Sequence, residues 1–300
     1  MTELVVETHS LVKRYGRVAA LDGLSLAVPR GSVYGFLGRN GAGKTTAIRV
    51  LAGLARPQSG EARVFGLHPE RDRLAILTRA GFVIEKMLLN SMTGNDLVRY
   101  NRSFFPSWSD AVARKYAEAL EVPMNRKFRK LSHGNKTKLC LLLALAQGAE
   151  LLVLDEPTLG LDPVITDQLL RVLIDDFAAS GRTLFISSHH LSEVEKIADW
   201  VGIIHNGRLL LEAQLDDIRA NYARVRASGS GLPRNAPEIV TVSDTEGVCD
   251  YVLRSGAEAF SAELRRQGAV ILDISPMNLS EIFLTLVGKE NRDAAVEVMA

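Results

Sequence analysis

Short, almost wholly apolar runs recur along the first two thirds of the chain, and polar residues follow each of them. These runs span residues 33–37, 81–84, 151–154 and 183–186. A run of four or five apolar residues bounded by polar ones is typical of a strand that is covered on both faces. The pattern therefore predicts the central sheet of an α/β domain.

The segments between these runs predict the remaining elements. Further strands are expected at residues 4–6, 24–28 and 62–65, with residues 11–16 between the first two, and helices at residues 131–146 and 163–179. Asn206-Gly207 joins the apolar runs 201–204 and 208–211 as a hairpin. Residues 93–130 are more polar and rich in helix. Within them, the aromatic segment 104–108 is interpreted as a local core under a loop, with a docking surface as the alternative.

The composition changes after about Ala220. Residues 227–237 are rich in Gly, Ser and Pro, which is typical of a linker or a long mobile loop. Beyond them we expect a small α+β module, with Asn278 capping its last helix, strands at 238–242, 251–253 and 269–274, and helices at 257–266 and 279–287. The sequence thus predicts two domains, 1–220 and 221–300. The second has no catalytic cluster, which favours a role in dimer or partner contacts.

Charge and apolar content narrow the class of protein. Among 300 residues, 36 are Lys or Arg and 35 are Asp or Glu, so a formal net charge of +1 favours neither nucleic acid nor an anionic membrane surface. The longest apolar run, residues 139–146, is far shorter than the roughly 20 residues that cross a bilayer. The acidic N-terminus does not resemble a secretion signal. Cys140 and Cys249 stand apart and are expected to be reduced packing residues in a cytosolic protein.

One stretch carries most of the candidate chemistry, and it directly follows the run at 33–37. It reads Gly38-Arg39-Asn40-Gly41-Ala42-Gly43-Lys44-Thr45-Thr46 and leads into a helical run. Such a loop lets backbone N–H groups approach a polyphosphate, with the positive end of the helix dipole behind them. Lys44 then reaches the β- and γ-phosphates, and the Thr45 hydroxyl ligates Mg²⁺. The alternative, a glycine turn that only packs strand against helix, does not explain Lys-Thr in this register.

Two carboxylates follow the apolar run at 151–154. Side chains at the C-terminal ends of strands lie at the rim where open α/β sheets bind ligands. Asp155 is placed there to hold Mg²⁺ through water, and Glu156 to polarise the water that attacks the γ-phosphate. The alternative is that Glu156-Pro157 only ends a strand, and the P-loop weighs against it.

Four further positions each have two interpretations. Ser132 suits an N-cap, and the helix N-terminus that it caps also suits an anion. Capping alone would explain Asp162, which precedes a proline. His189 follows the strand at 183–187 and could hydrogen-bond a γ-phosphate or lie in solvent. Tyr15 could stack on an adenine ring or be an ordinary half-buried aromatic.

Taken in order, these motifs resemble those of the ATPase subunits of ABC transporters. The resemblance covers about residues 4–220 and comprises the aromatic loop at Tyr15, Walker A at 38–46, the signature motif at 131–135, Walker B at 154–157, the D-loop at 159–162 and the switch histidine at His189. It implies a P-loop NTPase with a RecA-like core, an N-terminal antiparallel β subdomain and a helical subdomain at about 86–148. It also implies two such domains that meet head to tail with ATP between them.

The resemblance assigns roles to individual residues. Ser132 and Gly134 would contact the γ-phosphate bound by the opposite subunit, and Asp162 would lie across the dimer interface. Glu156 would be the general base, and His189 would hold γ-phosphate and water in place.

This chain departs from the family pattern at three positions. The signature is usually Leu-Ser-Gly-Gly-Gln, so His133 and Asn135 are substitutions. Glu85 stands where the family has a Mg²⁺-linked glutamine, and a carboxylate there could still coordinate the metal through water.

The resemblance is closest to single-domain ATPases of bacterial ABC-2-type exporters, including drug-efflux and acetoin-utilisation relatives. The expected function is to bind and hydrolyse MgATP in a homodimer or paralogue heterodimer and so power export by a separate ABC-2-type permease. The subunit would be cytoplasmic, peripheral on the inner face of the membrane, with no nucleic-acid partner. One alternative is a soluble ABC-type ATPase acting on ribosomes or DNA, although such relatives usually carry tandem domains or a coiled-coil insertion. A small-molecule kinase is the other, and it leaves residues 131–135 unexplained.

Overall fold

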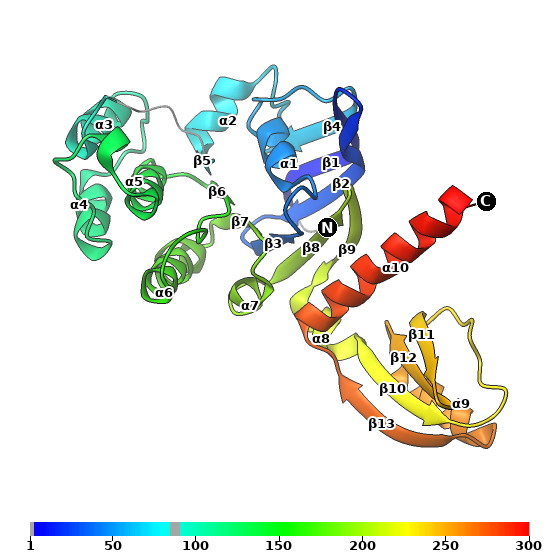
Figure 1. Cartoon of the computed structure of the whole chain (residues 1–300). Helices are drawn as coiled ribbons and strands as arrows, with labels where there is room; N and C mark the ends of the chain where they lie inside the picture. Colours follow the sequence, from blue (N-terminus) through cyan, green and yellow to red (C-terminus); the bar gives the residue numbers. More distant parts are fainter. Residues whose placement is uncertain (1–2, 85–90, 300) are drawn as a thin grey trace. The chain divides into compact units, whose positions relative to one another are not determined.

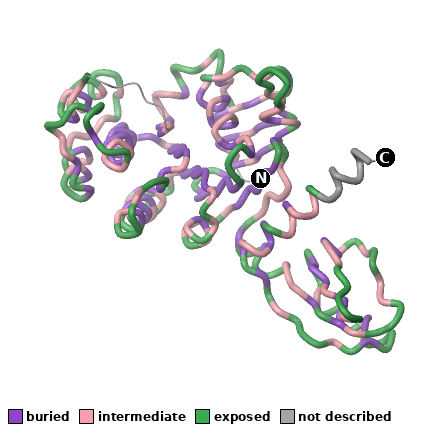
Figure 2. Tube along the Cα trace, in the orientation of Figure 1, coloured by how far each residue is buried: buried purple, intermediate pink, exposed green. Residues whose placement is uncertain are grey.

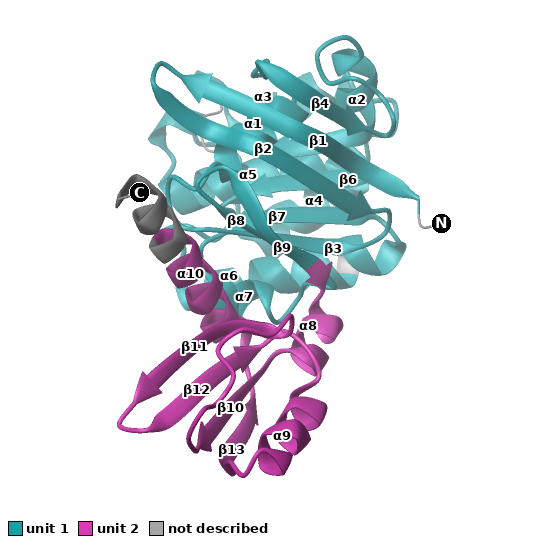
Figure 3. Cartoon of the chain, turned by 90° about the vertical axis from the view of Figure 1, so that its right-hand side faces the viewer, with its two compact units in different colours: residues 1–212 teal, residues 213–300 magenta. Residues whose placement is uncertain are grey.

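A computed structural model of the chain describes residues 3–84 and 91–299. The chain divides into two compact units, Met1–Glu212 and Ala213–Ala300 (Figure 3). The composition placed the boundary near residue 220. Each unit has a hydrophobic core of its own.

The first unit is built on a six-stranded sheet in the order β5-β6-β7-β3-β8-β9 (Figure 1). Its strands are β3 (Val33–Leu37), β5 (Ala80–Val83), β6 (Leu151–Asp155), β7 (Thr183–Ser188), β8 (Trp200–His205) and β9 (Arg208–Gln214). The first five of these are parallel. Every residue of β3, β6 and β7 is buried, as the purple core of Figure 2 shows. The predicted buried strands are confirmed. Because β3, β6 and β7 are parallel, their C-terminal ends, which precede the candidate site residues, lie on the same side of the sheet.

A three-stranded antiparallel sheet in the order β2-β1-β4 forms the N-terminal subdomain (Figure 3). Its strands are β1 (Leu4–Tyr15), β2 (Val18–Pro29) and β4 (Ser59–Val64). The strand predicted over residues 4–6 is confirmed but is longer than expected, because β1 continues to Tyr15. Its pairing with β2 shifts register at three points beyond Thr8, and Ser10 has a φ of 46°. Such bulges let polar residues interrupt the apolar alternation without ending the strand.

Helices cover the central sheet and form a separate helical group. The first set comprises α1 (Lys44–Leu51), α2 (Arg73–Arg79), α6 (Pro163–Arg171) and α7 (Leu191–Val194), and the helical group comprises α3 (Gly94–Arg102), α4 (Asp110–Ala119) and α5 (His133–Ala146) (Figure 1). Since α5 is buried from Lys138 to Ala146, it forms the centre of that group. The single helix predicted over 163–179 instead continues from α6 as a π-helix, Val172–Phe177, and a 3₁₀ turn, Ala178–Ser180.

The aromatic segment at 104–108 is only partly a local core. Trp108 is half-buried, packs against the core of the helical group and donates from Nε1 to Asp110 at 2.8 Å. Phe104 is 57% exposed, and its ring centroid lies 4.8 Å from that of Tyr100. The core interpretation therefore holds for Trp108 and is wrong for Phe104.

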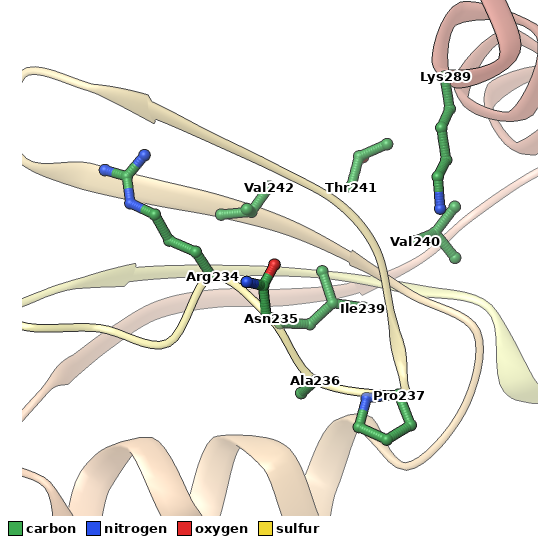
Figure 4. Close-up of a pocket in the computed structure, with 9 residues that line it drawn as sticks. All are labelled: Arg234, Asn235, Ala236, Pro237, Ile239, Val240, Thr241, Val242 and Lys289. Carbon is green, nitrogen blue, oxygen red and sulfur yellow. The ribbon is translucent and has the colours of Figure 1, made fainter. Parts of the chain in front are cut away.

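The second unit is a four-stranded antiparallel sheet in the order β11-β12-β10-β13. Its elements are α8 (Leu215–Asn221), β10 (Ala223–Ser228), β11 (Ile239–Thr245), β12 (Val248–Leu253), α9 (Ala257–Arg266), β13 (Val270–Pro276) and α10 (Leu279–Met299). Residues 227–237 are not a linker between units. Residues 227 and 228 belong to β10, a strand that the sequence did not predict, and residues 229–237 form the loop that leads to β11. This loop, β11 and Lys289 line a shallow groove of about 710 Å³ (Figure 4).

Two further expectations can be checked within the described residues. None of the helices there combines the length and the apolar character that a bilayer crossing requires. Cys140 and Cys249 are both buried and free, as expected of packing residues. Burial raises the pKa of the Cys140 thiol to about 12, which leaves it unreactive.

Candidate active site

The P-loop joins β3 to α1, and its glycines are required by close contacts. A methyl group at Gly38 would lie 2.6 Å from the carbonyl oxygen of Ile204. At Gly43, which has a φ of 114°, a methyl group would lie 2.5 Å from the carbonyl oxygen of Ala20. The loop is also tied to its neighbours, because Gly38 N–H donates to the Ser188 carbonyl at 3.3 Å. The sheet thus fixes the loop before any ligand arrives.

Lys44 lies inside this loop and is only 5% exposed. Its Nζ donates to the carbonyl oxygens of Gly38 at 2.6 Å and Arg39 at 3.3 Å. The same Nζ lies 2.9 Å from Oε1 of Glu156. A buried ammonium group needs such partners, and the loop therefore closes around its own lysine.

The two carboxylates at the end of β6 differ in their surroundings. Asp155 is buried, and its Oδ1 accepts a hydrogen bond from Ser187 Oγ at 2.7 Å. Glu156 adopts a left-handed conformation with a φ of 50°. Its N–H donates to the carbonyl of Ser187 at 3.2 Å and to the Ser187 hydroxyl at 3.1 Å. These bonds hold the strained residue at the tip of the strand.

Glu156 links Lys44 to His189. Its Oε2 lies 2.8 Å from His189 Nδ1, and its Oε1 faces Lys44. Oε1 is buried but accepts no hydrogen bond from the described residues, because the Lys44 contact is an ion pair without hydrogen-bond geometry. The structure therefore brings together a cation, a carboxylate and an imidazole from three neighbouring strand ends, and leaves one carboxylate oxygen available to a further donor.

The signature segment and the D-loop contact each other within this chain. Ser132 is exposed and caps α5, accepting from Asn135 N–H at 3.3 Å. A methyl group at Gly134 would lie 2.8 Å from Leu161, and one at Gly160 would lie 3.4 Å from His133. The side of α5 that begins at His133 also lines a cavity of about 130 Å³ with both carboxylates. The signature segment and the D-loop are thus adjacent.

The remaining predicted site residues are accounted for as follows. Asp162 is exposed and caps α6 through two bonds of 3.1 Å, to Val164 N–H and Ile165 N–H. Tyr15 ends β1 and is 48% exposed, with Lys13 Nζ 5.1 Å from its ring centroid. Glu85 lies outside the described residues.

Comparison with known proteins decides the family. A profile described as ABC transporter matches residues 21–159, which include the P-loop and both carboxylates. The chain is 32% identical to the bacitracin transport ATP-binding protein BcrA of Enterococcus faecalis, over 95% of this chain and 97% of that protein. It belongs to the ABC transporter ATP-binding proteins. Identity to BcrA of Bacillus licheniformis is 39%, over 72% of this chain and 71% of the relative.

Solved structures agree with the fold of this ABC protein. The ATP-binding subunit of an ABC transporter superposes with a TM-score of 0.65 at 26% identity, covering 72% of this chain and 92% of that one. A dimeric bacterial ABC transporter cassette gives a TM-score of 0.63 at 19% identity, over 70% of this chain and 98% of that one, which shows the fold alone. The predicted P-loop NTPase fold and ATPase activity are confirmed.

Two polar residues around the ABC motifs escaped the sequence analysis. Ser187 was counted only as the end of a strand, yet its hydroxyl touches both carboxylate residues. Thr158 Oγ1 donates to Glu193 at 2.7 Å and so ties the start of the D-loop to α7. Each bond joins residues more than thirty positions apart, and local sequence carries no signal for it.

Proposed function

We propose that this ABC ATPase hydrolyses MgATP at an interface between two ATPase subunits and so drives export through a separate membrane permease. The second subunit is another copy or a paralogue, and the permease, of ABC-2 type, holds the pair at the cytoplasmic face of the membrane. Relatives support this proposal, because they are named for bacitracin transport, daunorubicin/doxorubicin resistance and lantibiotic transport. Since these names include chemically different compounds, substrate choice is assigned to the permease.

The observation that carries the mechanism is the convergence of Lys44, Glu156 and His189. A polyphosphate in the P-loop competes with the Glu156 carboxylate for the Lys44 ammonium group. Phosphate carries more negative charge than a carboxylate and meets the loop N–H groups as well. Glu156 is then free to accept the proton of an attacking water, and His189 keeps it oriented through Nδ1.

The chain offers hard oxygen donors for Mg²⁺. Thr45 lies in the first turn of α1, and Asp155 ends the strand beside β7. In the described part of the chain, no group of three or more His, Cys, Asp and Glu side chains could hold a metal alone. That donor set fits Mg²⁺, which usually keeps waters and substrate phosphates among its ligands. Bound Mg²⁺ would offset the charge on the β- and γ-phosphates. Glu85 is proposed as a further, water-mediated ligand.

The exposed motif residues are assigned to contacts with the second subunit and with the adenine ring of ATP. Ser132 and Asp162 are exposed, so a neighbouring chain can reach both of them. Ser132 and Gly134 would complete the γ-phosphate site of the opposite subunit, and Asp162 would lie across the dimer interface and couple the two sites. Tyr15 presents half of its ring to solvent and is assigned to stacking on adenine.

Three variants test the proposed chemistry. Lys44→Ala is expected to abolish ATP binding or hydrolysis, because the loop loses the cation that faces phosphate. Glu156→Gln should retain ATP, trap a dimer and lose about 100- to 10,000-fold in turnover, which is the usual contribution of a positioned base. The matched control is Glu150→Gln, because Glu150 is a carboxylate at the opposite end of β6 from Glu156. Wild-type turnover in purified Glu156→Gln would show that the base is misassigned.

A pull-down tests the proposed partner. The full chain, expressed with an affinity tag and purified from detergent-solubilised membranes in the presence of ATP, should bring down a polytopic membrane protein. Recovery of ribosomes in place of a permease would overturn the proposed role in export.

A further inference from the structure

The Ser187 hydroxyl lies at the centre of the site, between the acidic strand and the P-loop strand. Ser187 pairs with Asp155 of β6 on one side and with Phe36 of β3 on the other. Its exposed fraction is 0%, so water does not compete for its hydroxyl. A buried hydroxyl must find its partners within the protein.

The hydroxyl uses its single proton and one lone pair in a fixed direction. Oγ donates to Asp155 Oδ1 at 2.7 Å and accepts the Glu156 N–H at 3.1 Å. The Ser187 carbonyl accepts the same N–H at 3.2 Å. Because a hydroxyl has one proton, donation to Asp155 leaves its lone pairs for Glu156. One side chain thus holds two neighbouring carboxylate residues at once.

The hydrogen bonds from the Glu156 N–H to Ser187 matter because the backbone of Glu156 is strained. A non-glycine residue with a φ of 50° persists only where its surroundings enforce it. This conformation turns the Glu156 side chain so that its two oxygens reach Lys44 and His189. Relaxation of the backbone would move the carboxylate away from both.

We propose that Ser187 is a positioning residue for ATP hydrolysis, which orients the Asp155 carboxylate and holds the Glu156 backbone in its left-handed conformation. The inference rests on the proposed roles of those two acidic residues. Within the described residues the Ser187 hydroxyl bonds the two carboxylate residues and not the P-loop. It therefore serves the hydrolytic step and metal placement, and the affinity of the loop for nucleotide does not depend on it.

Thr183, at the other end of β7, provides a matched control. It is also buried, at 1% exposed, and its Oγ1 accepts a hydrogen bond from Gly31 N–H at 2.9 Å. Thr183→Val removes a buried hydroxyl from the same strand without touching the carboxylates. Any loss that comes only from weakening β7 should appear in both variants.

The test compares Ser187→Ala, Ser187→Thr and Thr183→Val with the wild type in the full chain. For Ser187→Ala we expect kcat to fall about 10- to 100-fold, because small displacements of reacting groups cause losses of this size. KM for ATP should stay unchanged within about twofold. Binding of a fluorescent ATP analogue in EDTA should match the wild type, whereas half-maximal turnover at saturating ATP should require a higher Mg²⁺ concentration. Ser187→Thr restores the hydroxyl and should recover most of kcat, and Thr183→Val should keep it.

The outcomes separate this proposal from the wider one. Ser187→Ala with wild-type kcat and wild-type Mg²⁺ dependence overturns the positioning role, and so does an equal fall in Thr183→Val at equal thermal stability. Glu156→Gln is measured in the same series. If it is inactive while Ser187→Ala is fully active, only the role of Ser187 is wrong; if it is fully active, the assigned base is wrong and the positioning role falls with it.

Discussion

Lys44 and Glu156 form an ion pair in which Nζ lies 2.9 Å from Oε1, so the cation proposed to face phosphate is paired with the carboxylate proposed to activate water. Both side chains are largely shielded, with exposed fractions of 5% and 14%. The carboxylate therefore occupies the electrostatic place of a phosphate. In the proposed mechanism nucleotide displaces this carboxylate, which links the arrival of ATP to the release of the proposed base.

The first prediction follows from that competition. Glu156→Gln removes the negative charge and nearly preserves the shape, so Lys44 remains free for phosphate. A solvent-exposed ion pair is worth up to about 1 kcal/mol, and breaking a shielded pair such as this one changes the free energy by at least that much. ATP affinity in EDTA should therefore rise at least about fivefold. Equilibrium titration with a fluorescent ATP analogue measures it, with Glu150→Gln as the control; weaker binding by Glu156→Gln would contradict the competition.

The second prediction concerns His189, whose Nδ1 holds Glu156 at 2.8 Å. His189→Leu removes this contact and should lower turnover about 100-fold, within the range of a lost acid–base partner, while ATP binding changes little. His189→Asn keeps an N–H group near the Nδ1 position and should retain more activity. The neighbouring exposed imidazole offers a control, because His190→Ala should remain close to wild type in phosphate release. Equal losses at both histidines would mean that the substitutions disturb the whole loop after β7, and would contradict a specific role for His189.

The sequence predicted the parts of the site that local pattern determines. The runs that became β3, β6 and β7 are apolar throughout, and the P-loop motif fixes the strand-to-helix turn between β3 and α1. Capping chemistry predicted Ser132, Asp162 and Asn278, and all three accept helix N–H bonds in the structure. In these cases the signal and the structure lie within a few residues of each other.

The sequence failed where the deciding contact is remote or irregular. β1 passes through His9 and Ser10 because bulges absorb them, and no composition rule places a bulge. β10 carries two arginines among small residues, so its pattern resembles a loop. Ser187 looks like any serine at a strand end, and only the register of β6 beside β7 brings its hydroxyl to Asp155. The role of Glu85 stays a prediction.

The third prediction concerns the capping box of α3. Asp96 accepts hydrogen bonds from the Thr93 hydroxyl and N–H and pairs with Arg99, and these bonds lower its pKa from 3.8 to about 2. Because the folded pKa is depressed, the stabilisation is present above about pH 4 and is lost as the pH falls towards 2. Asp96→Ala should therefore melt below the wild type at pH 7, and the gap should close in acid.

Thermal unfolding followed by circular dichroism across this pH range measures the gap. Asn95→Ala provides the control on the same helix, because a neutral side chain adds no pH-dependent difference. A gap between Asp96→Ala and the wild type that stays constant from pH 7 to pH 2 would contradict the assignment.

The fourth prediction concerns Glu212, which accepts hydrogen bonds from Ala27 N–H and from the hydroxyl of Tyr34 on β3. Burial raises the pKa of this carboxyl, and the two hydrogen bonds oppose the rise only in part. A raised folded pKa favours the protonated form, so the wild type loses stability as the pH rises from the unfolded value of 4.5 through the folded one. Glu212→Gln is neutral at every pH and keeps an acceptor oxygen. It should match the wild type near pH 4 and melt at a higher temperature at pH 8.

A second variant separates the charge from the hydrogen bonds of Glu212. Glu212→Ala leaves the Ala27 N–H and the Tyr34 hydroxyl without their acceptor, which should cost about 1–3 kcal/mol. This loss should appear at pH 4 as well as at pH 8, because it does not depend on titration. If Glu212→Gln were less stable than the wild type at pH 8, the carboxylate would be stabilising in the fold, and the direction assigned to its pKa would be wrong.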